Sequence, residues 1–158
     1  MAESLQLPKI EVFNIDSIEQ LADRLPHRSK FFTLFLAWNA PVIERDKLMV
    51  LFQPLVDRGL VYFCAWGNRC EEVHDAVDMC IEERQPEAGQ ADYMLMTTWH
   101  QDEPLEEALW FFKMLAIPSE NHVLADFERF SVAVGNPEWA GKMERELFTP
   151  ESEEAQGS

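Results

Sequence analysis

A thiol, an imidazole and a carboxylate occur in two short segments that we expect to follow strands. Cys70 ends the segment 66–70, and His100 and Asp102 lie in the segment 98–102. These are the groups of a cysteine nucleophile site, in which a base activates the thiol and an acid orients the base. A helix that begins near Cys70 would also favour its thiolate through free backbone N–H groups and the helix dipole. One hypothesis is therefore a small cysteine-dependent enzyme that uses Cys70 as nucleophile, His100 as base and Asp102 as orienting acid.

A second interpretation of these residues involves no reaction. Cysteine often serves as a small buried side chain, and a histidine after a strand can simply bond a backbone carbonyl. Other reaction motifs are missing, because the chain has no GxxxxGK[ST] phosphate loop, no GxGxxG turn and no GxSxG elbow. We therefore prefer a non-catalytic protein and predict no cofactor.

His74 and Asp78 are four residues apart, a spacing that places two metal ligands on one face of a helix. Glu71 and Asp75 are close by in the sequence. No third ligand follows from the spacing rules for zinc or calcium. A solvated acidic helix face is the preferred interpretation, so we predict no metal.

Four of the five tryptophans lie where a predicted strand ends or the next helix begins, at positions 38, 66, 99 and 139. In a parallel sheet all four belong to the carboxyl edge, where open α/β sheets bind their ligands. They either pack there structurally or form an aromatic surface for a partner. We predict a binding surface that consists of Trp38, Trp66, Asn68, Arg69, Cys70, Trp99 and His100. A small-molecule sensor with a pocket walled by Trp38, Trp66 and Trp99 is a further alternative.

The charge of the chain restricts its partners. The formal net charge is −16 over 158 residues, which disfavours nucleic-acid phosphates and anionic membranes and favours a basic protein partner. Solubility alone would also explain this charge. Hydrophobic residues make up 47% of the chain, enough for one domain with a substantial core.

The cysteines and the N-terminus indicate a compartment. Cys64, Cys70 and Cys80 form neither a CxxC pair nor a zinc spacing, and an odd number of cysteines favours free thiols in a reducing environment. Residues 1–4 are polar and acidic and do not resemble a signal peptide. No stretch approaches the ~20 apolar residues of a membrane span. We expect a cytoplasmic protein that does not enter a membrane.

The elements that would position these residues alternate between strands and helices. Continuous apolar runs predict buried strands, and apolar residues at helical spacing predict the helices between them. Pro54 falls inside one helix, where we expect a kink or a late restart. The predicted strands are 10–15, 31–38, 61–66, 93–98 and 131–134, and the predicted helices are 18–25, 44–58, 71–84, 104–117 and 137–148.

Parallel strands joined by helices form a three-layer sandwich. We therefore predict an α/β fold with a mainly parallel sheet of four or five strands, in a single domain over residues 1–148. Residues 149–158 form an acidic tail that we expect to be disordered. Trp110 and Phe111 widen the apolar stripe of their helix, which is consistent with a homodimer contact.

Three strings in this chain resemble a family of small bacterial proteins described as a domain of unknown function. They are AWGxxC at 65–70, AVDM at 76–79 and MTTWHxDEPL at 96–105. The similarity extends over about 31–112 and more weakly to 147. It implies a compact α/β protein and no particular activity. Together with the acidic charge, it leads us to expect a non-catalytic binding protein, such as a bacterial immunity or regulatory factor that engages a basic partner.

Overall fold

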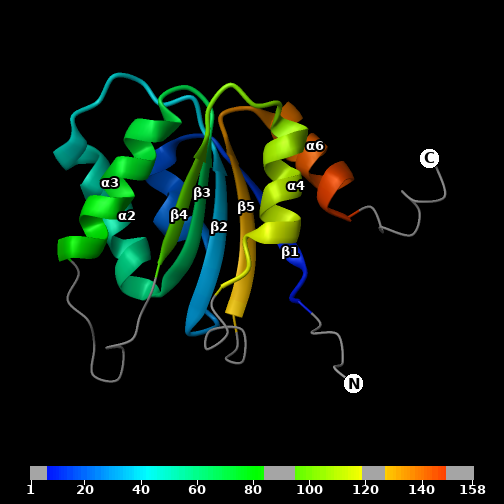
Figure 1. Cartoon of the computed structure of the whole chain (residues 1–158), viewed down its shortest axis with the longest axis horizontal. Coiled ribbons are helices and arrows are strands. Elements are labelled where there is room, and N and C mark those ends of the chain that lie inside the picture. The colour runs from blue at the N-terminus through cyan, green and yellow to red at the C-terminus, as the bar shows by residue number, and fades with distance from the viewer. Residues whose placement is uncertain (1–6, 84–94, 119–126, 149–158) are drawn as a thin grey trace.

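The computed structural model describes residues 7–83, 95–118 and 127–148, and these form one parallel sheet with helices on both faces (Figure 1). The predicted α/β three-layer fold is confirmed. The sheet has five strands in the order β1-β5-β2-β3-β4. The strands are β1 (Ile10–Ile15), β2 (Phe31–Ala37), β3 (Leu60–Trp66), β4 (Met96–His100) and β5 (Phe127–Val134). The helices are η1 (Ile18–Gln20), α1 (Leu21–Arg24), α2 (Arg45–Arg58), α3 (Cys70–Glu83), α4 (Leu105–Leu115) and α6 (Pro137–Phe148).

The chain changes direction once within the sheet. From β2 it proceeds through β3 to the edge strand β4, and it then returns to place β5 between β1 and β2. Helices α1, α2 and α3 pack on one face, whereas α4 and α6 pack on the other. Because crossovers between parallel strands are right-handed, reversing the direction of travel moves the connecting helix to the opposite face.

Each face of the sheet has its own core. Phe52 of α2 packs against Phe63 of β3 on one face, with ring centroids 5.6 Å apart. Phe112 of α4 packs against Phe35 of β2 on the other face, at 5.7 Å. All seven residues of β2 are buried, which explains why this strand reads as a continuous apolar run.

Most element boundaries lie within a residue or two of those predicted. Two strands differ more: β4 extends to His100, and β5 begins at Phe127 rather than at residue 131. The sequence obscured the start of β5 because it carries Glu128 and Arg129, which interrupt the apolar run. The acidic tail predicted at 149–158 lies outside the described residues.

Of the kink or late restart predicted at Pro54, the restart does not occur, because α2 continues through this residue. A proline removes the backbone N–H that would bond the carbonyl four residues earlier. That carbonyl belongs to Val50, whose side chain is 73% exposed. Because this side of the helix faces water, solvent can satisfy the carbonyl and the helix continues.

Arg129 connects β5 to the C-terminal end of α4. Its guanidinium is 4% exposed and donates to the carbonyl oxygens of Phe112 and Lys113, both at 3.0 Å. Carbonyls in the last turn of a helix lack partners within the helix, and a cation there is also favoured by the helix dipole. Burial lowers the pKa of Arg129 to about 10. The two hydrogen bonds from Arg129 fix the C-terminal end of α4, the helix that follows the edge strand β4.

Within the described ranges, no helix combines the length and the apolar character that crossing a membrane requires.

Gly59 ends α2 in a left-handed conformation with φ +117°. A Cβ atom there would lie 2.1 Å from the backbone oxygen of Lys30, so Gly59→Ala combines backbone strain with a steric clash. We expect a loss of about 2 kcal/mol or more in the free energy of unfolding, measured by urea denaturation. Gly141→Ala is the matched control, because its nearest atom would be 3.7 Å away within α6. It should stabilise the protein by about 0.5–1 kcal/mol. A Gly59→Ala variant as stable as the wild type would contradict this account of the turn.

Candidate functional site

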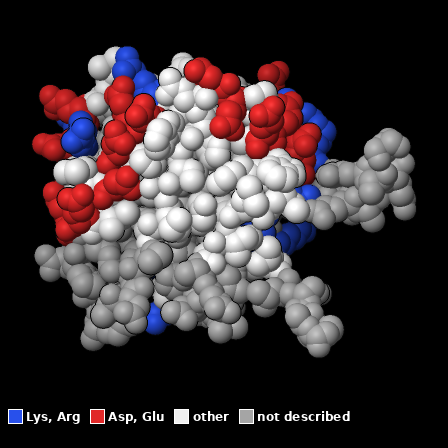
Figure 2. Space-filling view, viewed as in Figure 1, with Lys and Arg blue, Asp and Glu red and all other residues white. Residues whose placement is uncertain are grey.

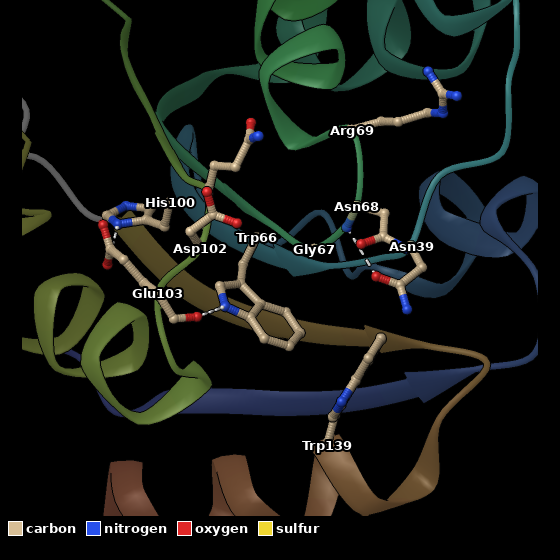
Figure 3. A pocket seen from close by; sticks show the side chains of 10 residues that line it. Asn39, Trp66, Gly67, Asn68, Arg69, His100, Asp102, Glu103 and Trp139 are labelled. Atoms are coloured by element: carbon tan, nitrogen blue, oxygen red, sulfur yellow. Dashed lines mark hydrogen bonds and ion pairs between the residues drawn. The ribbon is translucent and has the colours of Figure 1, made fainter.

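A pocket of about 310 Å³ lies at the carboxyl edge of the sheet (Figure 3). The segments after β2, β3 and β4 contribute to it, together with the first turn of α6. Its lining consists of Asn39, Trp66, Gly67, Asn68, Arg69, His100, Gln101, Asp102, Glu103 and Trp139. The pocket lies where α3 and α4 leave neighbouring strands toward opposite faces of the sheet, the position at which open α/β folds bind ligands.

Backbone contacts hold the floor of the pocket together. The amide of Asn68 donates to Oδ1 of Asn39 at 2.8 Å, and the amide of Trp38 donates to the carbonyl of Trp66 at 3.0 Å. Gly67 has φ +120°, and a Cβ atom there would lie 2.2 Å from the carbonyl oxygen of Trp38. A glycine is required at this position because the two segments approach so closely.

Two tryptophans form the aromatic wall of the pocket. Trp66 and Trp139 meet edge to face, with ring centroids 5.1 Å apart. The indole N–H of Trp66 donates to the carbonyl oxygen of Glu103 at 2.8 Å, which fixes the orientation of the ring. Both side chains are half-buried. An oriented aromatic pair that remains accessible is suited to contacting a ligand.

His100 is buried beside this wall and oriented by its neighbours. Its Nδ1 lies 3.2 Å from Oε1 of Glu103, and its Nε2 lies 2.9 Å from the hydroxyl of Thr98. We assign the donor role to Nδ1, because a carboxylate can only accept. The imidazole also packs on Phe111 of α4 at 4.8 Å. His100 therefore orients the side chain of Glu103, a residue of the pocket lining.

The charged side chains of the pocket are mainly acidic. Asp102 is exposed and adopts φ +63°, a conformation that Asp tolerates better than most residues. Glu103 is the second carboxylate of the lining. Arg69 pairs with Glu72 at 2.9 Å, and Figure 3 shows its side chain extending away from Trp66 and Asp102. The positive charge is therefore already neutralised, whereas the Asp102 carboxylate remains available.

The structure does not bring all the predicted binding residues together. Trp66, Asn68, Arg69 and His100 line the pocket as expected. Trp38 is 7% exposed and belongs to the core. Trp99 is on β4, where successive side chains point to opposite faces, and it packs on His74 of α3 at 4.6 Å. The aromatic side chains therefore leave the carboxyl edge in different directions, and Trp38, Trp66 and Trp99 do not wall one pocket.

The geometry does not support the cysteine-enzyme hypothesis. Helix α3 begins at Cys70, as predicted, but the thiol is buried in the core on the α3 face of the sheet. The His100 ring contacts Phe111 on the α4 face, and its Nδ1 is next to Glu103 rather than Asp102. The thiol reaches the backbone of His100, Cys70 and Gly67, and its contact with His100 does not involve the imidazole. Burial raises the pKa of Cys70, opposite to the lowered pKa that a nucleophile requires.

Trp110 and Phe111, predicted to form a dimer contact, have different environments. Trp110 is 56% exposed on the outer side of α4, whereas Phe111 packs inside the molecule against His100. Of this pair, only Trp110 is exposed enough to contact another chain. The homodimer remains a prediction.

Sequence reasoning omitted three residues that shape the pocket: Asn39, Glu103 and Trp139. Trp139 is one of the four edge tryptophans, but the predicted binding surface does not include it. It lines this pocket and two adjoining hollows, one between α4 and α6 and one beside Gly135. Its position immediately after the Asn136-Pro137 helix start was the available signal, because the first turn of a helix lies at the sheet edge.

The sequence comparisons identify the family of the chain. The model of a family described as domain of unknown function (DUF7684) matches residues 10–149. The chain belongs to this family. The DUF7684 match also includes β1, which the resemblance over 31–112, with its weaker extension to 147, does not cover. None of the curated proteins compared with the chain matches it.

The burial of the cysteines predicts low thiol reactivity. All three thiols are buried, and burial raises the pKa of Cys64 to about 12 and that of Cys80 to about 11. A raised pKa lowers the thiolate fraction at a given pH, so a thiolate-selective reagent should react slowly with the native protein. At pH 8 we expect at least ~10-fold faster labelling after denaturation. Rapid labelling of Cys70 in the native protein, located by peptide mapping, would revive the enzyme hypothesis.

Proposed function

We propose that this protein is a non-catalytic binding protein whose carboxyl-edge pocket receives a cationic side chain of a basic partner protein. The observation that carries the proposal is the combination of an oriented Trp66–Trp139 wall with the carboxylates of Asp102 and Glu103 in one pocket. Aromatic faces attract cations, and nearby carboxylates supply the opposite charge. Lysine and arginine side chains combine an apolar stem with such a cation.

The electrostatic environment favours the same class of partner. Figure 2 shows one face of the molecule. Acidic side chains gather on the part of it that lies nearest the carboxyl ends of the strands, with few basic side chains among them. The formal net charge of the whole chain is −16, of the same sign. A negative field accelerates encounters with a basic partner and disfavours acidic ones.

The size of the pocket supports a side chain rather than a large ligand. At about 310 Å³ it lies at the lower end of the range for small-molecule sites. Its charged and polar lining also differs from the mostly apolar lining of such sites. A protein that binds a basic partner without transforming it has the property that an immunity or regulatory factor requires.

Short peptides test the proposal directly. In a ¹⁵N-labelled sample, an arginine-containing peptide should shift the indole N–H signals of Trp66 and Trp139. The same peptide with citrulline in place of arginine should shift them far less, because citrulline keeps the shape and loses the charge. Equal shifts with both peptides, or shifts confined to other tryptophans, would contradict the proposal.

Substitutions in the pocket should lower the affinity for the arginine peptide, and the loss should depend on which contact is removed. Asp102→Asn keeps the left-handed backbone accessible and should cost about two- to five-fold in affinity, the effect of one exposed ion pair. Trp139→Ala should cost about five- to thirty-fold through loss of a cation–π contact of about 1–2 kcal/mol. Glu107→Gln is the control, because Glu107 is exposed on α4 and does not line the pocket. An equal loss in Glu107→Gln would indicate a general charge effect instead of a defined site.

A further inference from the structure

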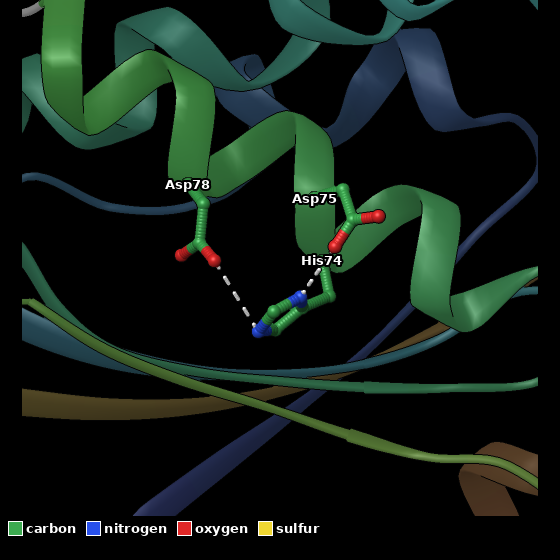
Figure 4. Close-up of side chains that lie close together, drawn as sticks. All are labelled: His74, Asp75 and Asp78. Carbon is green, nitrogen blue, oxygen red and sulfur yellow. Dashed lines mark hydrogen bonds and ion pairs between the residues drawn. The ribbon is translucent and has the colours of Figure 1, made fainter.

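A second polar cluster lies on the opposite side of β4 from the pocket. His74, Asp75 and Asp78 of α3 converge there (Figure 4), and Thr97 of β4 completes the group. Nε2 of His74 is 2.9 Å from Oγ1 of Thr97 and 3.5 Å from Oδ2 of Asp78. None of these residues lines the carboxyl-edge pocket. The cluster is therefore a separate feature, which the proposed function does not use.

The histidine of the cluster is buried, whereas the two aspartates are partly exposed. His74 is 8% exposed and stacks against the indole of Trp99, with ring centroids 4.6 Å apart. The side chains of Asp75 and Asp78 are 48% and 43% exposed. A buried nitrogen ligand is thus held rigidly, while a carboxylate beside it remains accessible from solvent.

The three contacts within the cluster outnumber the protons that its side chains can donate. Three short contacts connect the groups: Asp75 with Nδ1 of His74 at 3.0 Å, Nε2 with Thr97 at 2.9 Å, and Thr97 with Asp78 at 2.8 Å. A neutral imidazole and a hydroxyl supply two protons, and carboxylates supply none. With the Thr97 hydroxyl donating to Asp78, Nε2 of a neutral ring keeps a free lone pair, the form in which histidine binds a metal ion.

The geometry favours the metal ion. Asp75 accepts from Nδ1, which leaves Nε2 as the free ligand, and ligating histidines in proteins usually have such a carboxylate on the other nitrogen. Ligand atoms around one ion with bonds of ~2.0–2.2 Å lie about 3–3.5 Å apart. The 3.5 Å between Nε2 and Oδ2 of Asp78 fits this range, whereas Nε2 and the Thr97 hydroxyl lie at a hydrogen-bond distance of 2.9 Å.

We propose that His74 and Asp78 bind a divalent transition-metal ion of the zinc class, with Asp75 as the residue that orients His74. Imidazole and carboxylate ligands suit Zn²⁺, Co²⁺ and Ni²⁺. Thr97 occupies the adjoining position on β4, and water fills the remaining ones. Metal that binds only the folded chain stabilises it, increasingly so as the free ion concentration rises.

The test uses the full chain after treatment with a chelator. Calorimetric titration with Zn²⁺ should give one site per chain, and paramagnetic Co²⁺ should quench tryptophan fluorescence through the nearby Trp99. Trp99→Phe should retain Zn²⁺ binding and lose most of the Co²⁺ quenching. Binding with undiminished quenching in Trp99→Phe would place the ion elsewhere and overturn the proposal.

Three further variants separate ligands from general charge. Asp78→Asn should weaken Zn²⁺ binding at least ~10-fold, and Asp75→Asn, which alters only the orienting carboxylate, about 10-fold or more. Glu71→Gln is the control, because Glu71 is an exposed acid at the start of the same helix. It should bind like the wild type. No saturable binding in the wild type, or the same affinity in Asp78→Asn and Glu71→Gln, would overturn the proposal. Circular dichroism checks that each variant is folded.

Discussion

The reversal of the chain after the edge strand β4 is the constraint on which the site depends. Right-handed crossovers place α3 on one face of the sheet and α4 on the other, although β3 and β4 are neighbours. The segments that leave these two strands must diverge, and the space between them is the pocket. The return to β5 then brings α6 to the α4 face, so that Trp139 reaches Trp66.

Side chains of the edge strand β4 alternate between the two faces of the sheet, so this strand contributes to a different polar cluster on each face. Thr98 and His100 point toward α4 and support the Glu103 carboxylate of the pocket. Thr97 and Trp99 point toward α3 and surround His74. Each histidine is therefore oriented by a threonine of β4 and by a carboxylate from its own local segment, on opposite faces of the sheet. One short strand supplies the support for both clusters.

Local signals in the sequence were sufficient for the fold but not for the site. The apolar runs of β2 and β3 and the Asn136-Pro137 helix start predicted these elements well, because each depends on neighbouring residues. The position of β5 depends on tertiary pairing, and strand order decided which segments met. The sequence also does not show to which face of the sheet a side chain near a strand end points. For this reason the sequence pairs Cys70 with His100, although they lie on opposite faces, and the predicted binding surface leaves out Trp139.

The central claim is that the carboxyl-edge pocket is the contact surface for a basic protein. The most direct measurement is site-specific photo-crosslinking in host cell lysate from position 68, in the exposed pocket segment, compared with position 50 on α2. The account predicts a crosslink from position 68 to a basic protein, next to a lysine or arginine, that Asp102→Asn diminishes. Crosslinks only from position 50, or to an acidic protein insensitive to Asp102→Asn, would contradict it.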